Sequence, residues 1–195
     1  MNELILEKRA LAKENGNPIL RDKSFELLIE KAKEINAKSI LEIGTNVGLS
    51  SSALLLELPY AKLTGIEILE DKRKEALENY KFFGVSDRAK IFLGDAKEIL
   101  PMLSGEYDLI FLDGPKGQYI QYLPMIMPLL KKGGILFADN VLHRGFVGDR
   151  VKTPHRHMTI KHSLENFLIY LTNTKGLETQ IYDIEDGVSV TKRLK

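Results

Sequence analysis

The sequence predicts an α/β fold with an open, mostly parallel sheet and helices on both faces. Short apolar runs alternate with helical patterns from Ser39–Ile43 to Gly134–Ala138. The last two apolar runs, Leu177–Ile184 and Val188–Lys192, flank the turn dipeptide Asp186-Gly187, so we expect them to pair antiparallel. Together these runs give a doubly wound sheet of about seven strands, in which the last strand is reversed.

The elements are assigned in chain order from periodicity and from capping residues. Residues 1–14 and 22–36 are expected to form N-terminal helices, separated by the breaker Asn15-Gly16-Asn17-Pro18. Asp71 is expected to cap a later helix, and Pro124 to lie in an early turn or a kink of its helix. The expected strands are Ser39–Ile43, Lys62–Ile68, Ala89–Leu93, Tyr107–Leu112 and Gly134–Ala138, and the further helices follow the Gly44–Ser50 loop to about Glu57 and cover Asp71–Phe83, Ala96–Leu103, Gln118–Leu130 and about Met158–Thr172.

The composition is that of one globular domain spanning residues 1–195, with 44% hydrophobic and 28% charged residues. The chain has no cysteine, which excludes disulfides, thiolate zinc sites and thiol nucleophiles. No apolar run approaches the roughly 20 residues that a membrane-spanning helix needs. The charged N-terminus is unlike a signal or transit peptide, so a cytoplasmic location is expected.

The charge is unevenly distributed, although the net charge is only +1. Residues 143–162, here called the basic segment, carry five Lys or Arg residues, one Asp and all four histidines. The segment is therefore +4 with neutral histidines, which leaves −3 for the rest of the chain. It is either a site for an anionic partner or a solvated surface loop.

Polar and glycine residues follow the first three strands, where ligands bind in open parallel sheets. Gly44 allows close backbone approach to a ligand, and Glu67 lies 23 residues later, at the distance expected for an acid that accepts hydrogen bonds from ribose. Asp95 can bind an adenine amino group or cap the next helix. A plain turn and a surface acid are the alternatives for Gly44 and Glu67, but the three signals in succession favour a nucleoside pocket.

The fourth and fifth strands end in Asp113 and in Asp139-Asn140. Two carboxylates and an amide oxygen form a hard, all-oxygen ligand set that suits Mg²⁺, Mn²⁺ or Ca²⁺. A role of Asp139 and Asn140 in a turn is the alternative.

These segments resemble the metal-dependent O-methyltransferases, the group that includes catechol and caffeoyl-coenzyme A O-methyltransferases. The resemblance runs from about residue 18 to 192 and rests on Leu41–Ser50 (LEIGTNVGLS), Gly94–Ala96 (GDA), Asp113–Tyr119 (DGPKGQY) and Asp139–Leu142 (DNVL). It implies a Rossmann-like class I methyltransferase fold, S-adenosylmethionine as methyl donor and a homodimer. Within the group, Lys116–Tyr119, Asp139–Gly145 and the basic segment are most similar to bacterial tRNA 5-hydroxyuridine methyltransferases.

The resemblance also implies roles for single residues. Asp113 and Lys116 would be catalytic, and Asp113, Asp139 and Asn140 would bind the metal. The residues expected around S-adenosylmethionine are Glu42, Gly44, Thr45, Asn46, Ser50, Glu67, Asp95, Ala96 and Asp113.

The predicted substrate is a wobble 5-hydroxyuridine in tRNA, and the alternative is a small catechol-like phenol. Both acceptors offer two adjacent oxygens that can chelate a metal. For tRNA, the basic segment would contact phosphates through Arg144, Arg150, Lys152 and Arg156. Tyr119 would pack against the substrate ring, or be an ordinary helix-face aromatic.

Two other functional classes are weighed against this hypothesis. A nucleotide-binding module without catalysis does not need the set of Asp113, Lys116, Asp139 and Asn140. An NAD-dependent oxidoreductase would carry the Gly-x-Gly-x-x-Gly fingerprint, which the Gly44–Gly48 loop lacks.

Overall fold

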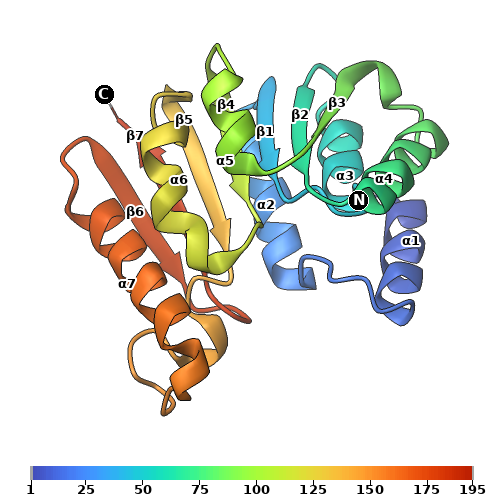
Figure 1. Ribbon diagram of the computed structural model, residues 1–195. Coiled ribbons are helices and arrows are strands. Elements are labelled where there is room, and N and C mark those ends of the chain that lie inside the picture. Colours follow the sequence, from blue (N-terminus) through green and yellow to red (C-terminus); the bar gives the residue numbers. More distant parts are fainter. Residues whose placement is uncertain (1, 195) are drawn as a thin grey trace.

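The computed structural model describes residues 2–194, which contain one seven-stranded sheet in the order β3-β2-β1-β4-β5-β7-β6 (Figure 1). Met1, the first residue of the first predicted helix, and Lys195 lie outside the described residues. The strands are β1 (Ser39–Ile43), β2 (Lys62–Glu67), β3 (Ala89–Leu93), β4 (Tyr107–Leu112), β5 (Leu130–Asp139), β6 (Leu177–Tyr182) and β7 (Val188–Arg193).

The pairing confirms the predicted topology. All strand pairs from β3 to β5 are parallel, whereas β7 runs antiparallel to both β5 and β6. Since β6 and β7 are joined by a short turn, β7 is the one reversed strand of the described sheet. The order changes direction between β1 and β4, and this crossover point is where an open α/β sheet leaves a crevice.

Helices cover both faces of the sheet, and each face has its own apolar core (Figure 1). Alternate strand residues point to opposite faces, so Ile40 and Leu109 contact one core while Leu41 and Ile110 contact the other. The first core is covered by α1 (Glu3–Glu14), α2 (Asp22–Glu34), α3 (Leu49–Glu57) and α4 (Glu70–Phe82), and the second by α5 (Ala96–Ile99), α6 (Tyr119–Ile126) and α7 (Met158–Asn173).

Several predicted boundaries differ from those of the structure. The helix predicted over residues 118–130 ends at Ile126, because Pro128 cannot continue it, and the following residues enter β5 at Leu130 instead of Gly134. Asp71 does not cap α4, since that helix begins one residue earlier and Asp71 lies in its first turn. There its charge still faces the positive end of the helix dipole.

The fifth predicted helix differs only in its internal geometry. The predicted helix over residues 96–103 is a single α-turn, α5, followed by a 3-10 turn at Leu100–Met102 that contains Pro101. Among residues 2–194, no helix is long and apolar enough to cross a membrane.

Candidate functional site

The carboxyl ends of β1, β2, β4 and β5 open onto one cleft of about 1220 Å³. Parallel strands end at the same edge of a sheet, so residues far apart in the sequence meet there. The cleft, here called the central cleft, is lined by Pro18, Ile19, Arg21, Gly44, Asn46, Glu67, Ile68, Leu69, Lys72, Asp113, Gly114, Pro115, Lys116, Asp139, Asn140 and Asp186.

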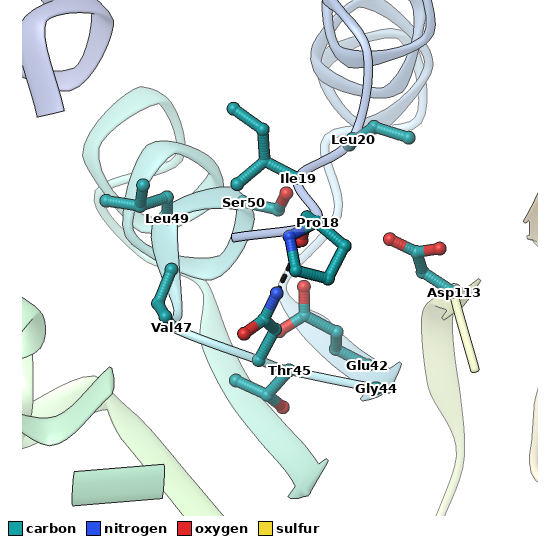
Figure 2. Close-up of a pocket in the computed structure, with 11 residues that line it drawn as sticks. Pro18, Ile19, Leu20, Glu42, Gly44, Thr45, Val47, Leu49, Ser50 and Asp113 are labelled. Carbon is teal, nitrogen blue, oxygen red and sulfur yellow. Dashed lines mark hydrogen bonds between the residues drawn. The ribbon is translucent and has the colours of Figure 1, made fainter. Parts of the chain in front are cut away.

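Two smaller pockets open beside the central cleft. The β1 pocket, about 290 Å³, lies above the loop after β1 and beneath Pro18–Leu20 (Figure 2). The β2–β3 pocket, about 390 Å³, is mostly apolar and is lined by Ile43, Ile66, Glu67, Ile68, Gly94, Asp95, Ala96, Pro115 and neighbouring residues. Gly44 lines all three spaces, so one elongated ligand can extend past it from pocket to pocket.

Gly44 has a backbone that other residues cannot adopt without strain. Its φ is +91°, and a Cβ there would lie 2.6 Å from the main-chain oxygen of Asp113. The N–H groups of Gly44 and Thr45 both donate to the carbonyl of Ile66, at 3.0 and 3.1 Å, which bends the loop across the end of β2. Thr45 itself is buried and packs against Gly65, while Ser50 lines the β1 pocket at the start of α3.

Glu42 is a buried acid on the floor of the β1 pocket. Its side chain is 1% exposed and accepts a hydrogen bond from the Ser51 hydroxyl. Burial raises the pKa of Glu42 to about 8, and the charge of Asp113 adds to this effect. The carboxyl group is therefore protonated at neutral pH in the absence of a cationic ligand.

Glu67 ends β2 at the junction of the β2–β3 pocket and the central cleft. Its two oxygens accept main-chain hydrogen bonds from Asn46 at 2.6 Å and from Leu69 at 2.9 Å. These bonds fix the carboxylate, whose remaining lone pairs can accept from a ligand. Asp95 caps α5 through the N–H of Lys97 at 2.8 Å, so the predicted capping role is confirmed, and it also lines the β2–β3 pocket.

Asp113, Asp139 and Asn140 all line the central cleft, as the positions of their strands predict. Asp139 is 3% exposed, and burial together with the charge of Asp113 raises its pKa to about 7. Asp139, whose ionisation the charge of Asp113 disfavours, would be stabilised in its ionised form by a hard cation held between it, Asp113 and the amide oxygen of Asn140. Within the described chain, no three His, Cys, Asp or Glu side chains gather as a metal site, so this set relies on Asn140 for its third ligand.

Lys116 lies next to this acidic set. Its Nζ donates to Oδ1 of Asp113 at 2.8 Å, and both side chains are 22% exposed. Lys116 begins a 3-10 turn three residues after Asp113, and both residues line the central cleft, where they can contact a ligand. The site therefore combines acids for a cation with an amine that can hold or accept a proton.

Tyr119 is not among the residues that line the central cleft, and of its two predicted roles the structure favours the ordinary helix aromatic. The residue is fully buried at the start of α6, and its ring lies edge-on to that of Phe167. Its hydroxyl donates to the main-chain oxygens of Leu112 and Asp139, at 3.0 and 3.1 Å. Tyr119 thus joins the ends of β4 and β5 beneath the site.

The basic segment borders the fold without lining the central cleft. Arg144, Arg150, Lys152 and Arg156 are all exposed. Arg150 forms an ion pair with Asp183 at 2.6 Å, and Lys161 pairs with Asp149, so part of the +4 charge is neutralised. The cations that do line the cleft are Arg21, Lys72 and Lys116.

Several residues of the cleft wall could not be predicted from the sequence. Pro18, Ile19 and Arg21 come from the segment between α1 and α2, in which the sequence marks only residues 15–18, as a breaker. Asp186 was assigned only as a turn residue. No local pattern marks these residues as part of a site, since they reach it through the packing of distant segments.

Comparison with known proteins identifies the family. A family model described as O-methyltransferase matches residues 15–194. The chain belongs to this family. It is an S-adenosylmethionine-dependent O-methyltransferase related to the caffeoyl-CoA O-methyltransferases.

Two curated plant proteins illustrate the relationship. Tapetum-specific methyltransferase 1 of Arabidopsis thaliana is 30% identical, and the alignment covers 100% of this chain and 84% of that protein. Caffeoyl-CoA O-methyltransferase of Medicago sativa is 28% identical, over 84% of this chain and 70% of that protein.

Solved structures agree in fold. The SAH-bound methyltransferase PaMTH1 of Podospora anserina has a TM-score of 0.86 and 26% identity, covering 99% of this chain and 88% of that chain. The O-methyltransferase TomG of Streptomyces achromogenes, in complex with SAM, has a TM-score of 0.87 and 23% identity, covering 100% and 91%. The class I methyltransferase fold predicted for this chain is confirmed.

Proposed function

We propose that this O-methyltransferase methylates one hydroxyl of a small phenol that carries a second oxygen on the adjacent ring carbon. The observation that carries the proposal is the Lys116–Asp113 pair, 2.8 Å apart, in a cleft that also contains Asp139 and Asn140. The name of the Medicago sativa relative supports it, because a caffeoyl group is a catechol.

The methyl donor is assigned to the two pockets that meet at Gly44. Its adenosine part fits the apolar β2–β3 pocket, where Glu67 is placed to accept from ribose hydroxyls and Asp95 from the adenine amino group. Its amino-acid part fits the β1 pocket, near Glu42 and Ser50. S-adenosylmethionine supplies a methyl group that is activated by the positively charged sulfur. After transfer, the rest of the donor leaves as S-adenosylhomocysteine, an uncharged thioether.

The acceptor is assigned to the central cleft. Asp113, Asp139 and Asn140 would hold Mg²⁺, or Mn²⁺ or Ca²⁺, and such an ion lowers the pKa of a hydroxyl that it binds. Lys116 is placed to take the proton of the acceptor hydroxyl, or to hold the oxyanion by a hydrogen bond. The walls of the cleft then orient the oxygen in line with the methyl carbon, so that the C–O bond forms as the C–S bond breaks.

A wobble 5-hydroxyuridine in tRNA is the second candidate acceptor. The observation that favours it is the exposure of Arg144, Lys152 and Arg156, which form no ion pair among the described residues. Three phosphate contacts to a single-stranded loop predict that log K falls with log salt with a slope of about 2. Charge reversal of Lys152 should flatten this slope by about 0.7, whereas reversal of Lys132, exposed at the far end of β5, should leave it unchanged.

The test is methyl transfer from labelled S-adenosylmethionine to a catechol panel and to tRNA lacking the modification, with Mg²⁺ or with chelator. We expect magnesium-dependent labelling of catechols that Asp139→Ala and Lys116→Met abolish. Asp87→Ala, at an exposed acid far from the cleft, is the matched control and should retain full activity. Labelling of tRNA alone would replace the phenol by the second candidate, and labelling that survives chelation would overturn the assigned metal set.

The homodimer stays a prediction. The mass of the purified protein in solution, measured by light scattering, tests it directly.

A further inference from the structure

The segment between α1 and α2, residues 15–21, crosses the site and is here called the strap. Gly16 and Pro18 break the helical pattern, so the strap forms a turn at residues 15–16 and contains neither helix nor strand. Pro18, Ile19 and Leu20 lie over the β1 pocket, across from Glu42 and Gly44 (Figure 2). In this position the strap closes the pocket assigned to the amino-acid part of the methyl donor.

On one side, the strap is anchored to elements of the cofactor site. Lys72 of α4 donates to the side chain of Asn17 at 2.7 Å, and the Asn46 amide donates to the carbonyl of Pro18, as the dashed line in Figure 2 marks. Arg9 of α1 donates to the carbonyl of Leu20 at 2.7 Å.

On the other side, the strap and the start of α2 are held by the turn between β6 and β7, residues 183–187. Glu185 accepts from the N–H groups of Lys23 and Ser24, at 3.2 and 3.1 Å, and from the Ser24 hydroxyl at 2.8 Å. Helix α2 has no side-chain cap at Arg21, so Glu185 supplies its cap from 161 residues away. Asp186 accepts from the guanidinium of Arg21 at 2.9 Å.

The main chain of the same turn holds the loop that follows Asp139 and Asn140. The N–H of Val141 donates to the carbonyl of Gly187 at 3.0 Å, and that of Leu142 to the carbonyl of Asp186 at 2.8 Å. Gly187 has φ +82°, and a Cβ there would lie 2.2 Å from the side chain of Leu142. The turn is therefore packed tightly against the loop that carries the candidate metal ligands.

We propose that the β6–β7 turn is a latch, in which Asp186 and Glu185 are positioning residues that hold the strap closed over the methyl donor. Asp186 bonds to the strap through its side chain and to the loop after Asn140 through its main chain, so it couples cofactor enclosure to the acceptor side of the cleft. The Arg21 side chain is 52% exposed, and an ion pair this exposed is weak enough to open and close readily. Donor and product can then exchange without unfolding of the turn.

The direct test is binding of S-adenosylhomocysteine by calorimetry, without acceptor or added metal. We expect Asp186→Asn to raise the Kd by about fivefold, the effect of losing one partly exposed ion pair. The matched control is Asp183→Asn, which removes a second ion pair of the same turn, with Arg150, that does not touch the strap. This control should bind as the native protein does.

Two further readouts separate a latch from a general loss of structure. In Asp186→Asn, trypsin should cleave faster after Arg21, in the strap, whereas the amides of Lys23 and Ser24 should stay protected by Glu185. In steady state, the KM for S-adenosylmethionine should rise while kcat stays within about twofold. The exchanged pair Arg21→Asp with Asp186→Arg should recover the native affinity.

The latch is refuted if Asp186→Asn binds S-adenosylhomocysteine with native affinity, if Asp183→Asn weakens binding equally, or if the exchanged pair recovers nothing. Should Asp186→Asn fail to fold, Arg21→Gln removes the same ion pair and leaves the turn intact. The test uses no acceptor, so failure of the phenol proposal leaves its outcome unaffected. A native protein that binds no S-adenosylhomocysteine would overturn both the latch and the assigned donor pockets.

Discussion

Replacing Glu42 with glutamine is expected to stabilise the protein increasingly as the pH rises. Burial raises the pKa of this carboxyl from 4.5 to about 8, so above pH 4.5 the unfolded chain releases a proton that the folded chain retains. The free energy of unfolding of the native protein therefore falls by about 1.4 kcal/mol per pH unit. The stability that comes from keeping Glu42 protonated is fully present below pH 4.5 and is lost by about pH 8. The total loss in unfolding free energy is about 5 kcal/mol.

Glutamine does not titrate, so the difference in unfolding free energy between Glu42→Gln and the native protein isolates the pH-dependent effect of the Glu42 carboxyl group. We expect a difference near zero at about pH 4.5, about 3 kcal/mol at pH 7 and about 5 kcal/mol above pH 8. Urea unfolding followed by circular dichroism, without cofactor, measures it at each pH. Glu26→Gln, at an exposed position of α2, is the control and should give a flat difference. An equally flat difference for Glu42→Gln would refute the reasoning, because it would mean that Glu42 is ionised in the folded protein.

Two further substitutions test the packing around the site. Tyr119→Phe removes a hydroxyl that joins the ends of β4 and β5, so we expect a loss of about 1–3 kcal/mol in thermal unfolding and no change in acceptor KM. A higher acceptor KM without a change in stability would indicate that Tyr119 contacts the substrate instead. Gly44→Ala places a Cβ 2.6 Å from the oxygen of Asp113 at a φ of +91°. Calorimetry should then show S-adenosylhomocysteine binding that is weaker by about 5-fold to about 150-fold, from strain of about 1–3 kcal/mol. Native affinity would show that this loop can shift freely.

The convergence of the candidate site could be predicted because topology alone produces it. Residues that end parallel strands meet at one edge, so Gly44, Glu67, Asp113 and Asp139 were expected to be close although they span almost half of the chain. The reversed last strand followed from a turn too short for a parallel connection. Both inferences need only the order and the direction of the strands.

Side-chain burial at the site could not be predicted in the same way. Tyr119 follows the DGPKGQ sequence and lies in a helix that starts at the cleft, which suggested contact with a ligand. The helix direction instead turns the ring beneath the sheet edge, toward Phe167 of α7. The position of α7, which begins 39 residues later, decides the role of Tyr119, and no pattern near Tyr119 encodes it.

The charge count of the basic segment failed for a related reason. It included Arg150 as a free cation, but the partner of Arg150 is Asp183, beyond α7 and β6 in the sequence. A local net charge describes a surface only when the neighbouring segments carry no compensating charge. Of the four cations expected to contact tRNA, three form no ion pair among the described residues, and the tRNA candidate therefore rests on these three.

The β6–β7 turn has one property that its local sequence predicts and another that depends on the tertiary fold. Asp186-Gly187 predicts a tight turn because glycine adopts positive φ there, and this part is local. Glu185 and Asp186 also hold the start of α2 and the strap, and this part depends on which edge of the sheet β6 and β7 join. Since β7 pairs with β5, the turn is brought next to the end of β5, where Asp139 and Asn140 lie. Antiparallel addition of β7 thus places a carboxylate-bearing turn at the carboxyl edge, whereas a parallel last strand would have placed that turn at the opposite edge, out of reach of the strap.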